Sequence, residues 1–236
     1  MKSFARILVT FTLPLYSIIG NATPFTIVRG KHLTVSYPES SRPILKTAIE
    51  LLGNDIHNVF DDTIDIVDKN AHIQIVIDPR IVIEEQGFKW IVNNTGTLVI
   101  IGHDSHGAAY GAMELSRMIG VSPWEWWADA APRKKDRFEL PEKFSLKKSP
   151  SVKYRGIFIN DEDWGLMPWS YKTFDPSDIA GRIGPKTNAK IFELLLRLRA
   201  NTYWPAMHEC SVPFFLTEGN REVAEQYGIY IGGSHC

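Results

Sequence analysis

The sequence predicts an α/β protein whose 236 residues fall into two parts. In the first part, short apolar runs alternate with stretches that have helical spacing, which is typical of strands and helices that follow one another along the chain. In the second part, short apolar runs end abruptly in groups of polar and ionisable residues. The length is sufficient for one or two domains with a substantial core.

The first 22 residues have the layout of a secretory signal peptide. Lys2 and Arg6 precede an apolar stretch over residues 7–19, and small residues follow up to Ala22. We expect cleavage after Ala22 and export to the periplasm or the medium. An uncleaved membrane anchor is the alternative, but the apolar stretch is short and Pro14 interrupts it. After cleavage we expect no contact with a membrane.

Charge and cysteine content narrow the classes of partner. A formal net charge of −1 and a pI near 6.7 argue against nucleic acid and anionic membranes. Cys210 and Cys236 are too few for a disulfide framework, and the histidines beside them lack the spacing of a metal site. Export would permit one bridge between these cysteines. We expect no metal and no cofactor.

Residues 23–130 are expected to form a small α/β domain. A hairpin across residues 93–96 is predicted by the apolar runs on both sides of a turn sequence. The expected strands are 33–37, 72–77, 88–92 and 97–101, and the expected helices are 43–60 and 105–118. The next stretch, residues 131–151, is rich in Pro and Lys and is interpreted as a linker.

Two motifs in the first part have a structural and a functional interpretation. Residues 102–107 (GHDSHG) are glycine-containing but lack the spacing of a phosphate-binding loop, which favours the start of a closely packed helix. Trp124, Trp126 and Trp127 are interpreted as a plug between domains, with a binding platform as the alternative.

Residues 152–236 are predicted to alternate strands with helices. The expected strands are 153–159, 201–204 and 228–232, and the expected helices are 191–199 and 221–227. The buried stripe of the first of these helices is expected to contain Ile191, Leu194, Leu195 and Leu198. Each strand ends in polar residues, as in a (β/α) barrel, which builds its site at the carboxyl ends of its strands.

A closed barrel needs eight such units and roughly 250 residues. Residues 152–236 supply about a third of that length, and the resulting sheet would be open at an edge. The predicted fold class is therefore a small α/β front domain followed by the first strands and helices of an incomplete (β/α)8 barrel. We expect the chain to be the N-terminal part of a larger protein.

Three long segments resemble glycoside hydrolase family 115. They are SPSVKYRGIFINDEDWG (residues 149–165), GPKTNAKIFELLLRLRANTYWPAMHE (184–209) and YGIYIGGSHC (227–236). The segment GHDSHGAAYGAMELSRMIGVSPWEWW (102–127) resembles the N-terminal domain of the same family, which is similar to domain 2 of hexosaminidases. The resemblance implies an α-glucuronidase that removes 4-O-methyl-glucuronic acid from glucuronoxylan or xylo-oligosaccharides. It also implies inversion of configuration and a full-length enzyme that could form a homodimer.

Glycoside hydrolysis usually requires two carboxyl groups, and the resemblance places both beyond Cys236. No catalytic pair is therefore assigned, and the chain alone is expected to be inactive. Carboxylates after the first strand could accept hydrogen bonds from sugar hydroxyls, and a tryptophan could stack on a sugar ring or simply pack in the core. Asp163 is expected to cap the turn. The expected substrate-binding residues are Asn160, Asp161, Glu162, Trp164, Trp204, His208, Glu209 and His235.

Two other functions are compatible with this sequence. A hexosaminidase-like glycosidase would have a similar front domain and barrel order. A non-catalytic carbohydrate-binding fragment would use the same polar strand ends without the chemistry.

Overall fold

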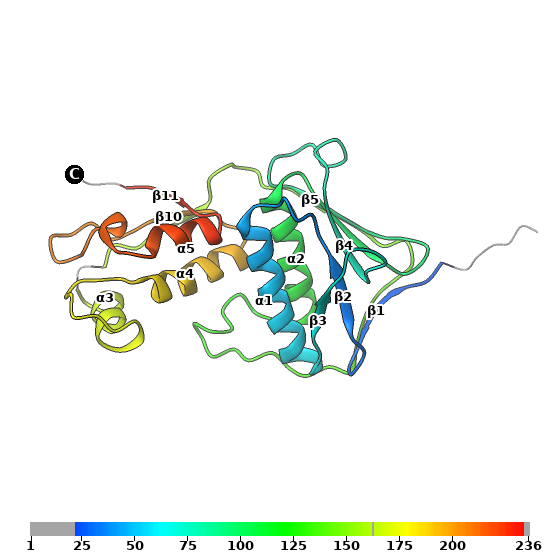
Figure 1. Cartoon of the computed structure of the whole chain (residues 1–236), viewed down its shortest axis with the longest axis horizontal. Helices are drawn as coiled ribbons and strands as arrows, with labels where there is room; N and C mark the ends of the chain where they lie inside the picture. Colours follow the sequence, from blue (N-terminus) through cyan, green and yellow to red (C-terminus); the bar gives the residue numbers. More distant parts are fainter. Residues whose placement is uncertain (1–21, 162, 234–236) are drawn as a thin grey trace, which may run out of the picture.

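In the computed structural model, which describes residues 22–161 and 163–233, a six-stranded sheet is covered by one pair of helices (Figure 1). A second pair of helices and a three-stranded sheet lie side by side beyond the first pair. Residues 22–148, here called the front unit, contain the larger sheet and the first helix pair. Residues 154–233, here called the second unit, contain the other helix pair and a short sheet. Residues 1–21 of the expected signal peptide, together with Glu162, His235 and Cys236, lie outside the described residues.

The sheet of the front unit has six strands, and its first four are parallel. Its order is β3 (Ile64–Ile66), β2 (Leu33–Ser36), β4 (Ile73–Ile77), β6 (Leu98–Gly102), β5 (Phe88–Val92) and β8 (Ser145–Lys148). The predicted hairpin is confirmed, because β5 and β6 pair antiparallel with Val92 opposite Leu98. A separate antiparallel pair joins β1 (Phe25–Val28) to β7 (Arg137–Leu140).

The segment interpreted as a linker is not one, because residues 131–151 contain β7 and β8. These strands pair with β1 and β5, so both are integral to the front unit. Their sequences, RFEL and SLKK, contain charged residues, which are common in strands at the edge of a sheet. Because of these residues, neither strand shows a clear apolar alternation in the sequence. The strand pairing itself depends on partners more than 50 residues away, which no local pattern reveals.

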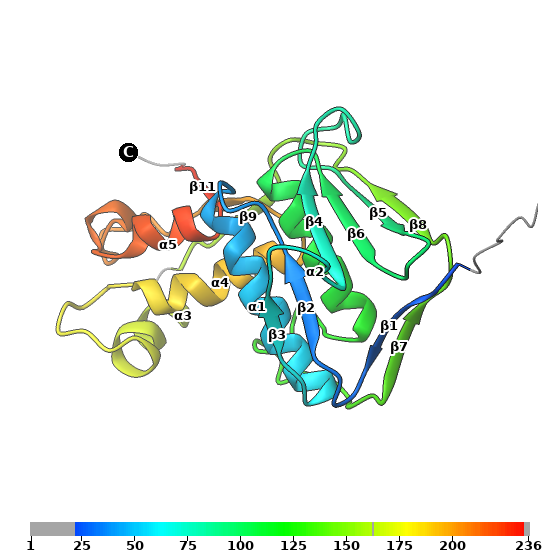
Figure 2. The same ribbon diagram turned by 45° about the vertical axis from the view of Figure 1, so that its right-hand side comes forward.

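Helices α1 (Pro43–Phe60) and α2 (Ser105–Ile119) lie between the large sheet and the second unit (Figure 2). This position buries almost every residue of α2, as expected for a helix covered on both sides. The Asp104 side chain accepts a hydrogen bond from the Gly107 backbone N–H and caps the helix. A Cβ atom on Gly107 would lie 2.1 Å from the Gly87 carbonyl oxygen, so the helix start packs closely on the sheet. Both predicted helices of the front unit are confirmed.

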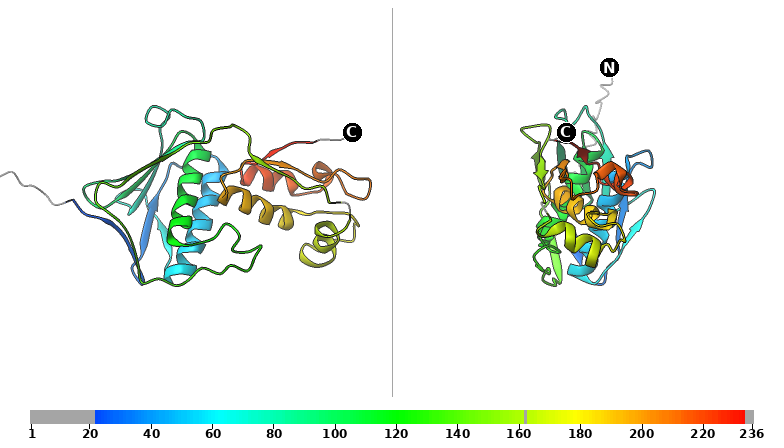
Figure 3. Two further views of the ribbon diagram at one scale, coloured as in Figure 1. Left: turned by 180° about the vertical axis from the view of Figure 1, so that it is seen from behind. Right: turned by 90° about the vertical axis from the view of Figure 1, so that its left-hand side faces the viewer.

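The second unit contains three short parallel strands with helices on one side. The sheet order is β11 (Tyr230–Ile231), β10 (Thr202–Trp204) and β9 (Gly156–Phe158). The helical segments are α3 (Leu166–Trp169), a π-helical turn (Ser170–Phe174), α4 (Pro185–Arg197), a 3-10 turn (Phe214–Leu216) and α5 (Asn220–Gln226). Seen from behind, α4 and α5 extend from the front-unit helices along the short sheet (Figure 3).

Four details of the second unit differ from the sequence prediction. Helix α4 begins at Pro185 rather than residue 191, because proline is well suited to the first helical turn. Leu198 is 46% exposed and lies after the end of α4, while Leu196 takes a fully buried place in the stripe. The first strand covers only residues 156–158 of the expected 153–159, and the helical segment at 166–174 had no sequence signal.

Buried charges connect the two units. The Arg197 guanidinium on α4 donates to the Asp55 carboxylate on α1 (Nη1 to Oδ2, 2.7 Å) and to Glu193 (Nε to Oε1, 3.0 Å). Ser116 on α2 donates to the same Asp55 oxygen at 2.5 Å. All four side chains are buried, so the network joins α1, α2 and α4 where their surfaces meet. Within the described residues, no helix combines the length and apolar character that a membrane crossing requires.

Candidate functional site

The carboxyl ends of β9, β10 and β11 meet at one edge of the short sheet because the three strands are parallel. The chain places polar and aromatic side chains at this edge: Asn160 and Asp161 after β9, Trp204 at the end of β10, and His208 four residues later. We call Asn160, Asp161, Trp204 and His208 the strand-end site. This is where parallel α/β sheets generally bind ligands.

Asn160 and His208 are brought together from two different strands. The Nε2 atom of His208 lies 2.6 Å from the Asn160 side-chain oxygen. Because an amide oxygen can only accept, Nε2 is the donor in this hydrogen bond. Asn160 is exposed and His208 is half-buried, so both side chains remain accessible beside their mutual contact.

The environment of Asp161 differs from the one expected of a residue that contacts a sugar. Its side chain is buried, and Oδ1 accepts from the Trp164 backbone N–H at 3.3 Å while Oδ2 accepts from that of Met167. These bonds hold the loop that leads into α3. The expected capping role of Asp163 is thus taken by Asp161, whereas Asp163 is exposed with φ 65°.

Trp204 lies on the face of the short sheet that the helices do not cover. It is 40% exposed, and its ring packs against Phe158 with a centroid distance of 6.2 Å. A Cβ atom on Gly232 would lie 1.9 Å from Trp204 Nε1, so only glycine lets the indole lie across the neighbouring strand. Trp164, in contrast, is 88% exposed on the loop after β9, and Glu209 is exposed as well.

A pocket of about 530 Å³ adjoins His208. Its volume is in the range of small-ligand sites. The lining residues are Pro205, Met207, His208, Ser211, Pro213, Phe214, Phe215, Ile231, Gly232 and Gly233. None of these is a carboxylate, so the described lining offers hydrogen-bonding and apolar contacts but no acid–base pair.

Tyr203 lies beneath the site, on the helix-covered side of β10, with its side chain fully buried. Burial raises the pKa of its hydroxyl above the usual range, and the negative charge of Asp161 acts in the same direction. The phenol therefore stays neutral. Its ring packs against Phe192 and Phe214, so the residues beneath the strand-end site are part of the hydrophobic core.

Comparison with known proteins identifies the family. A model of glycosyl hydrolase family 115 matches residues 147–236. A solved family GH115 4-O-methyl-alpha-glucuronidase with specificity for decorated arabinogalactans is 52% identical to this chain, with a TM-score of 0.85 over 90% of it. The chain belongs to glycosyl hydrolase family 115. It spans 30% of the length of that solved family GH115 protein.

More distant structures share the fold. The β-hexosaminidase of Streptomyces plicatus is 10% identical, with a TM-score of 0.59, and the match covers 90% of this chain and 42% of that one. The exo β-N-acetylglucosaminidase of Vibrio harveyi is 15% identical, with a TM-score of 0.55, covering 89% and 33%. At these identities the similarity concerns the mixed α/β fold alone. The chain has no match among curated proteins.

Other sequence-predicted features of this family 115 chain have clear places in the structure. Trp127 Nε1 donates to the Lys190 carbonyl at 3.1 Å, and the rings of Trp126 and Trp127 pack against Trp169 of the second unit. These contacts favour the interpretation as a plug between units, although Trp124 is 50% exposed. Residues 102–107 contain the last residue of β6, the Asp104 cap and the first turn of α2, as expected for a closely packed helix start.

Sequence analysis did not identify Phe158, Met207 or Ser211 as neighbours of the site. The alternation of β9 offers a signal for Phe158, because it shares a sheet face with its register partner Trp204. Met207 and Ser211 follow β10 in a loop without periodicity. Cys210 is a free, exposed thiol, and the described residues contain no cluster of side chains suited to a metal ion.

Proposed function

We propose that this chain is part of an α-glucuronidase that hydrolyses glucuronic acid or 4-O-methyl-glucuronic acid side chains from a polysaccharide. The observation that carries this proposal is the 52% identity, over 90% of the chain, to a 4-O-methyl-alpha-glucuronidase. The strand-end site supports it, because an exposed tryptophan beside a histidine and an amide is suited to a sugar ring and its hydroxyls.

The second unit is proposed to be the beginning of a (β/α)8 barrel. Its three parallel strands carry α4 and α5 on one face and leave Phe158 and Trp204 uncovered on the other. In a closed barrel that second face would be the interior, where larger side chains fill the space. Further strands would complete the wall around the strand-end site.

Within this proposal, the strand-end site binds the substrate rather than cleaving it. Trp204 would stack on a sugar face, and the Asn160–His208 pair would hydrogen-bond to hydroxyl or carboxylate oxygens. Asp161 would fix the loop that shapes the site. The acid and base of an inverting reaction require two carboxyl groups about 6.5–9.5 Å apart. We expect the chain alone to be inactive, because no described carboxylate lines the pocket.

Two polysaccharides are candidates for the polymer that carries the uronic-acid side chain. The resemblance implies glucuronoxylan, while the 52% identical protein has specificity for decorated arabinogalactans. Both substrates can carry the same uronic-acid unit, so we propose that this unit is what the site recognises. The identity favours arabinogalactan as the backbone to test first.

The test is the release of glucuronic acid by the complete protein that carries this chain. Decorated arabinogalactan and glucuronoxylan are incubated in parallel, and released uronic acid is separated by anion-exchange chromatography. Trp204→Ala should lower kcat/KM by about 5- to 150-fold, which corresponds to roughly 1–3 kcal/mol for an aromatic stacking contact. Trp124→Ala is the matched control and should leave the rate unchanged.

Two results would contradict the proposal. Hydrolysis of N-acetylhexosaminides without release of uronic acid would favour the hexosaminidase-like alternative. Binding of uronic-acid sugars by a complete protein that cleaves nothing would favour a carbohydrate-binding role.

We also propose that the protein is exported. The charged, apolar and small-residue order of residues 1–22 supports this proposal. N-terminal sequencing of the protein from its native host should begin at Thr23, and a chain that retains Met1 would contradict cleavage.

A further inference from the structure

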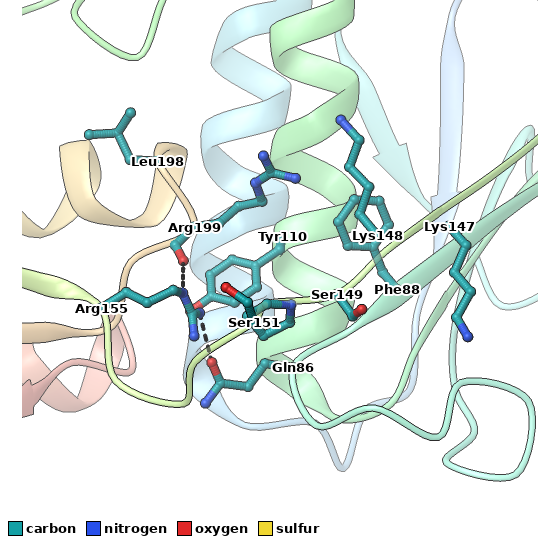
Figure 4. Close-up of a pocket in the computed structure, with 11 residues that line it drawn as sticks. Gln86, Phe88, Tyr110, Lys147, Lys148, Ser149, Ser151, Arg155, Leu198 and Arg199 are labelled. Atoms are coloured by element: carbon teal, nitrogen blue, oxygen red, sulfur yellow. Dashed lines mark hydrogen bonds between the residues drawn. The ribbon is translucent and has the colours of Figure 1, made fainter.

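A second pocket, of about 530 Å³, lies between the two units (Figure 4). It is located at the amino-terminal ends of β9 and β10, opposite the strand-end site, because Arg155 immediately precedes β9 and Arg199 lies shortly before β10. Tyr110 of α2 and Ser151 contribute to the same wall. This pocket has more positive than negative charge.

A buried carboxylate beside the pocket is paired with three cations, two of which, Lys148 and Arg199, line the pocket. Glu114 on α2 forms ion pairs with Arg117 at 2.5 Å, Lys148 at 2.8 Å and Arg199 at 3.8 Å. Burial alone would raise the pKa of Glu114, but hydrogen bonds from Arg117 and Lys148 hold it below its usual value. Glu114 therefore carries a single negative charge that cannot neutralise all three partners.

Arg155 adds a fourth cation without a carboxylate. Its guanidinium donates to the carbonyls of Val152, Lys153 and Arg199, to Gln86 Oε1 at 2.8 Å, and to the Tyr110 hydroxyl at 3.4 Å. These acceptors are neutral. No carboxylate of the described residues lies within 4.0 Å of Arg155, so its charge is held in place but not compensated.

Arg199 is the cation best placed to bind a ligand. Its side chain is 40% exposed, and its contact with Glu114 at 3.8 Å is too long for a hydrogen bond. The guanidinium thus keeps donors for an incoming anion, and Figure 4 places it on the same side of the pocket as Lys148. Lys147 is a different case, because it pairs with Glu84 at 2.8 Å and points away from Arg199.

We propose that this interunit pocket binds the carboxylate of a uronic-acid sugar, with Arg199 and Lys148 as its cationic ligands. The inference rests on the proposed function for the choice of a sugar acid. Guanidinium and ammonium groups suit a carboxylate, the exposed Leu198 suits the apolar face of a ring, and Ser149 and Ser151 suit hydroxyl groups. The volume accommodates one monosaccharide unit. Such a site would bind a second acidic unit of a decorated polymer.

The test is isothermal titration of the purified protein with glucuronic acid, glucose or inorganic phosphate. A Trp204→Ala background weakens binding at the strand-end site, so the remaining binding reports on the interunit pocket. Glucuronic acid should bind in this background, more weakly at higher salt, and glucose should not. Arg199→Gln should weaken binding at least tenfold, Arg199→Lys should retain most of it, and Arg80→Gln, at an exposed arginine elsewhere, should have no effect. Thermal melting of each variant checks that it is folded.

Three outcomes would overturn the inference: no binding of glucuronic acid, equal binding of glucose, or unchanged binding in Arg199→Gln. Binding of phosphate but not of glucuronic acid would also overturn it, since the pocket would then select a tetrahedral oxyanion. The two proposals fail separately. Release of uronic acid by a protein whose pocket binds nothing rejects the pocket alone, and pocket binding by a protein that releases none rejects the proposed activity alone.

Discussion

Asp161 is the clearest case in which one residue has a role that its neighbours in the sequence do not reveal. It belongs to a run of acidic residues, yet both of its oxygens accept backbone N–H groups and its side chain is buried. A carboxylate in this position orders the turn after β9. Its effect on a sugar would then be indirect, through the position of the loop that begins at Asn160.

Asp161→Ala should destabilise the protein by about 1–3 kcal/mol, because two buried backbone donors lose their acceptor. Urea denaturation measures this change. Asp161→Asn keeps an oxygen for one of the two bonds and should lose clearly less stability. Equal stability of Asp161→Ala and the wild type would show that the loop does not depend on these hydrogen bonds.

A second single residue, Tyr227, makes the stability of the folded protein depend on pH. Burial raises the pKa of its hydroxyl to about 12, with Glu193 adding to the shift, whereas an unfolded tyrosine titrates near 10. The unfolded state therefore loses its proton first as pH rises. The contribution of Tyr227 to the free energy of unfolding is therefore fully present below pH 10. It is lost between about pH 10 and 12 and amounts to on the order of 2–3 kcal/mol.

Denaturation at pH 9, 10, 11 and 12 tests this dependence against Tyr227→Phe. The variant should decline less steeply over that interval but not become flat, since burial also raises the pKa of Tyr110 and Tyr203. Identical slopes for both proteins would contradict the assignment to Tyr227.

At the scale of secondary structure, periodic elements follow closely from the sequence and polar ones do not. Helix α1 and the β5–β6 hairpin match their predictions because apolar spacing and turn residues are local signals. Strands β7 and β8 were missed because charged residues dominate them. In the short sheet, β9 and β10 approach each other closely at Gly156. Only glycine fits at this position, because any side chain would collide with the backbone of Thr202.

Gly156→Ala should prevent normal pairing of β9 and β10, because the added Cβ would lie 1.7 Å from the Thr202 carbonyl oxygen. We expect a loss of at least about 3 kcal/mol, the upper end for overpacked sites. Gly53→Ala is the matched control. It lies in α1 with no atom within 4 Å of its added Cβ, and should stabilise the protein by about 0.5–1 kcal/mol. Thermal melting of both variants is sufficient, and a similar melting temperature for the two would contradict the β9–β10 register.

At the scale of the whole molecule, the two units share one continuous hydrophobic core. The cluster includes Leu52 of α1 and Leu115 of α2 together with Phe192 of α4 and Tyr203 of β10. The Arg197 network lies in the same layer of helices. Because the units bury each other's surfaces, we expect them to unfold together.

Arg197→Ala should cost about 3–5 kcal/mol, because it leaves the buried carboxylates of Asp55 and Glu193 without their cation. The control is Arg80→Ala, whose exposed pair with Asp78 should contribute at most about 1 kcal/mol. Calorimetry should give one transition for the wild type and for both variants. Two separate transitions in the wild type would show that the units are independent.

The sequence by itself determined the periodic helices and strands, the resemblance to the family and the positions of polar residues at three strand ends. These depend on local spacing or on long contiguous motifs. Only the tertiary structure decided which of those residues meet. Asn160 contacts His208 from 48 residues away, and Asp55 contacts Arg197 from 142 residues away. Arg155 and Arg199 line one pocket, and Glu114 pairs with Arg199 beside it. The energies of such contacts depend on burial and distance between segments that fold together, and a linear pattern contains neither quantity.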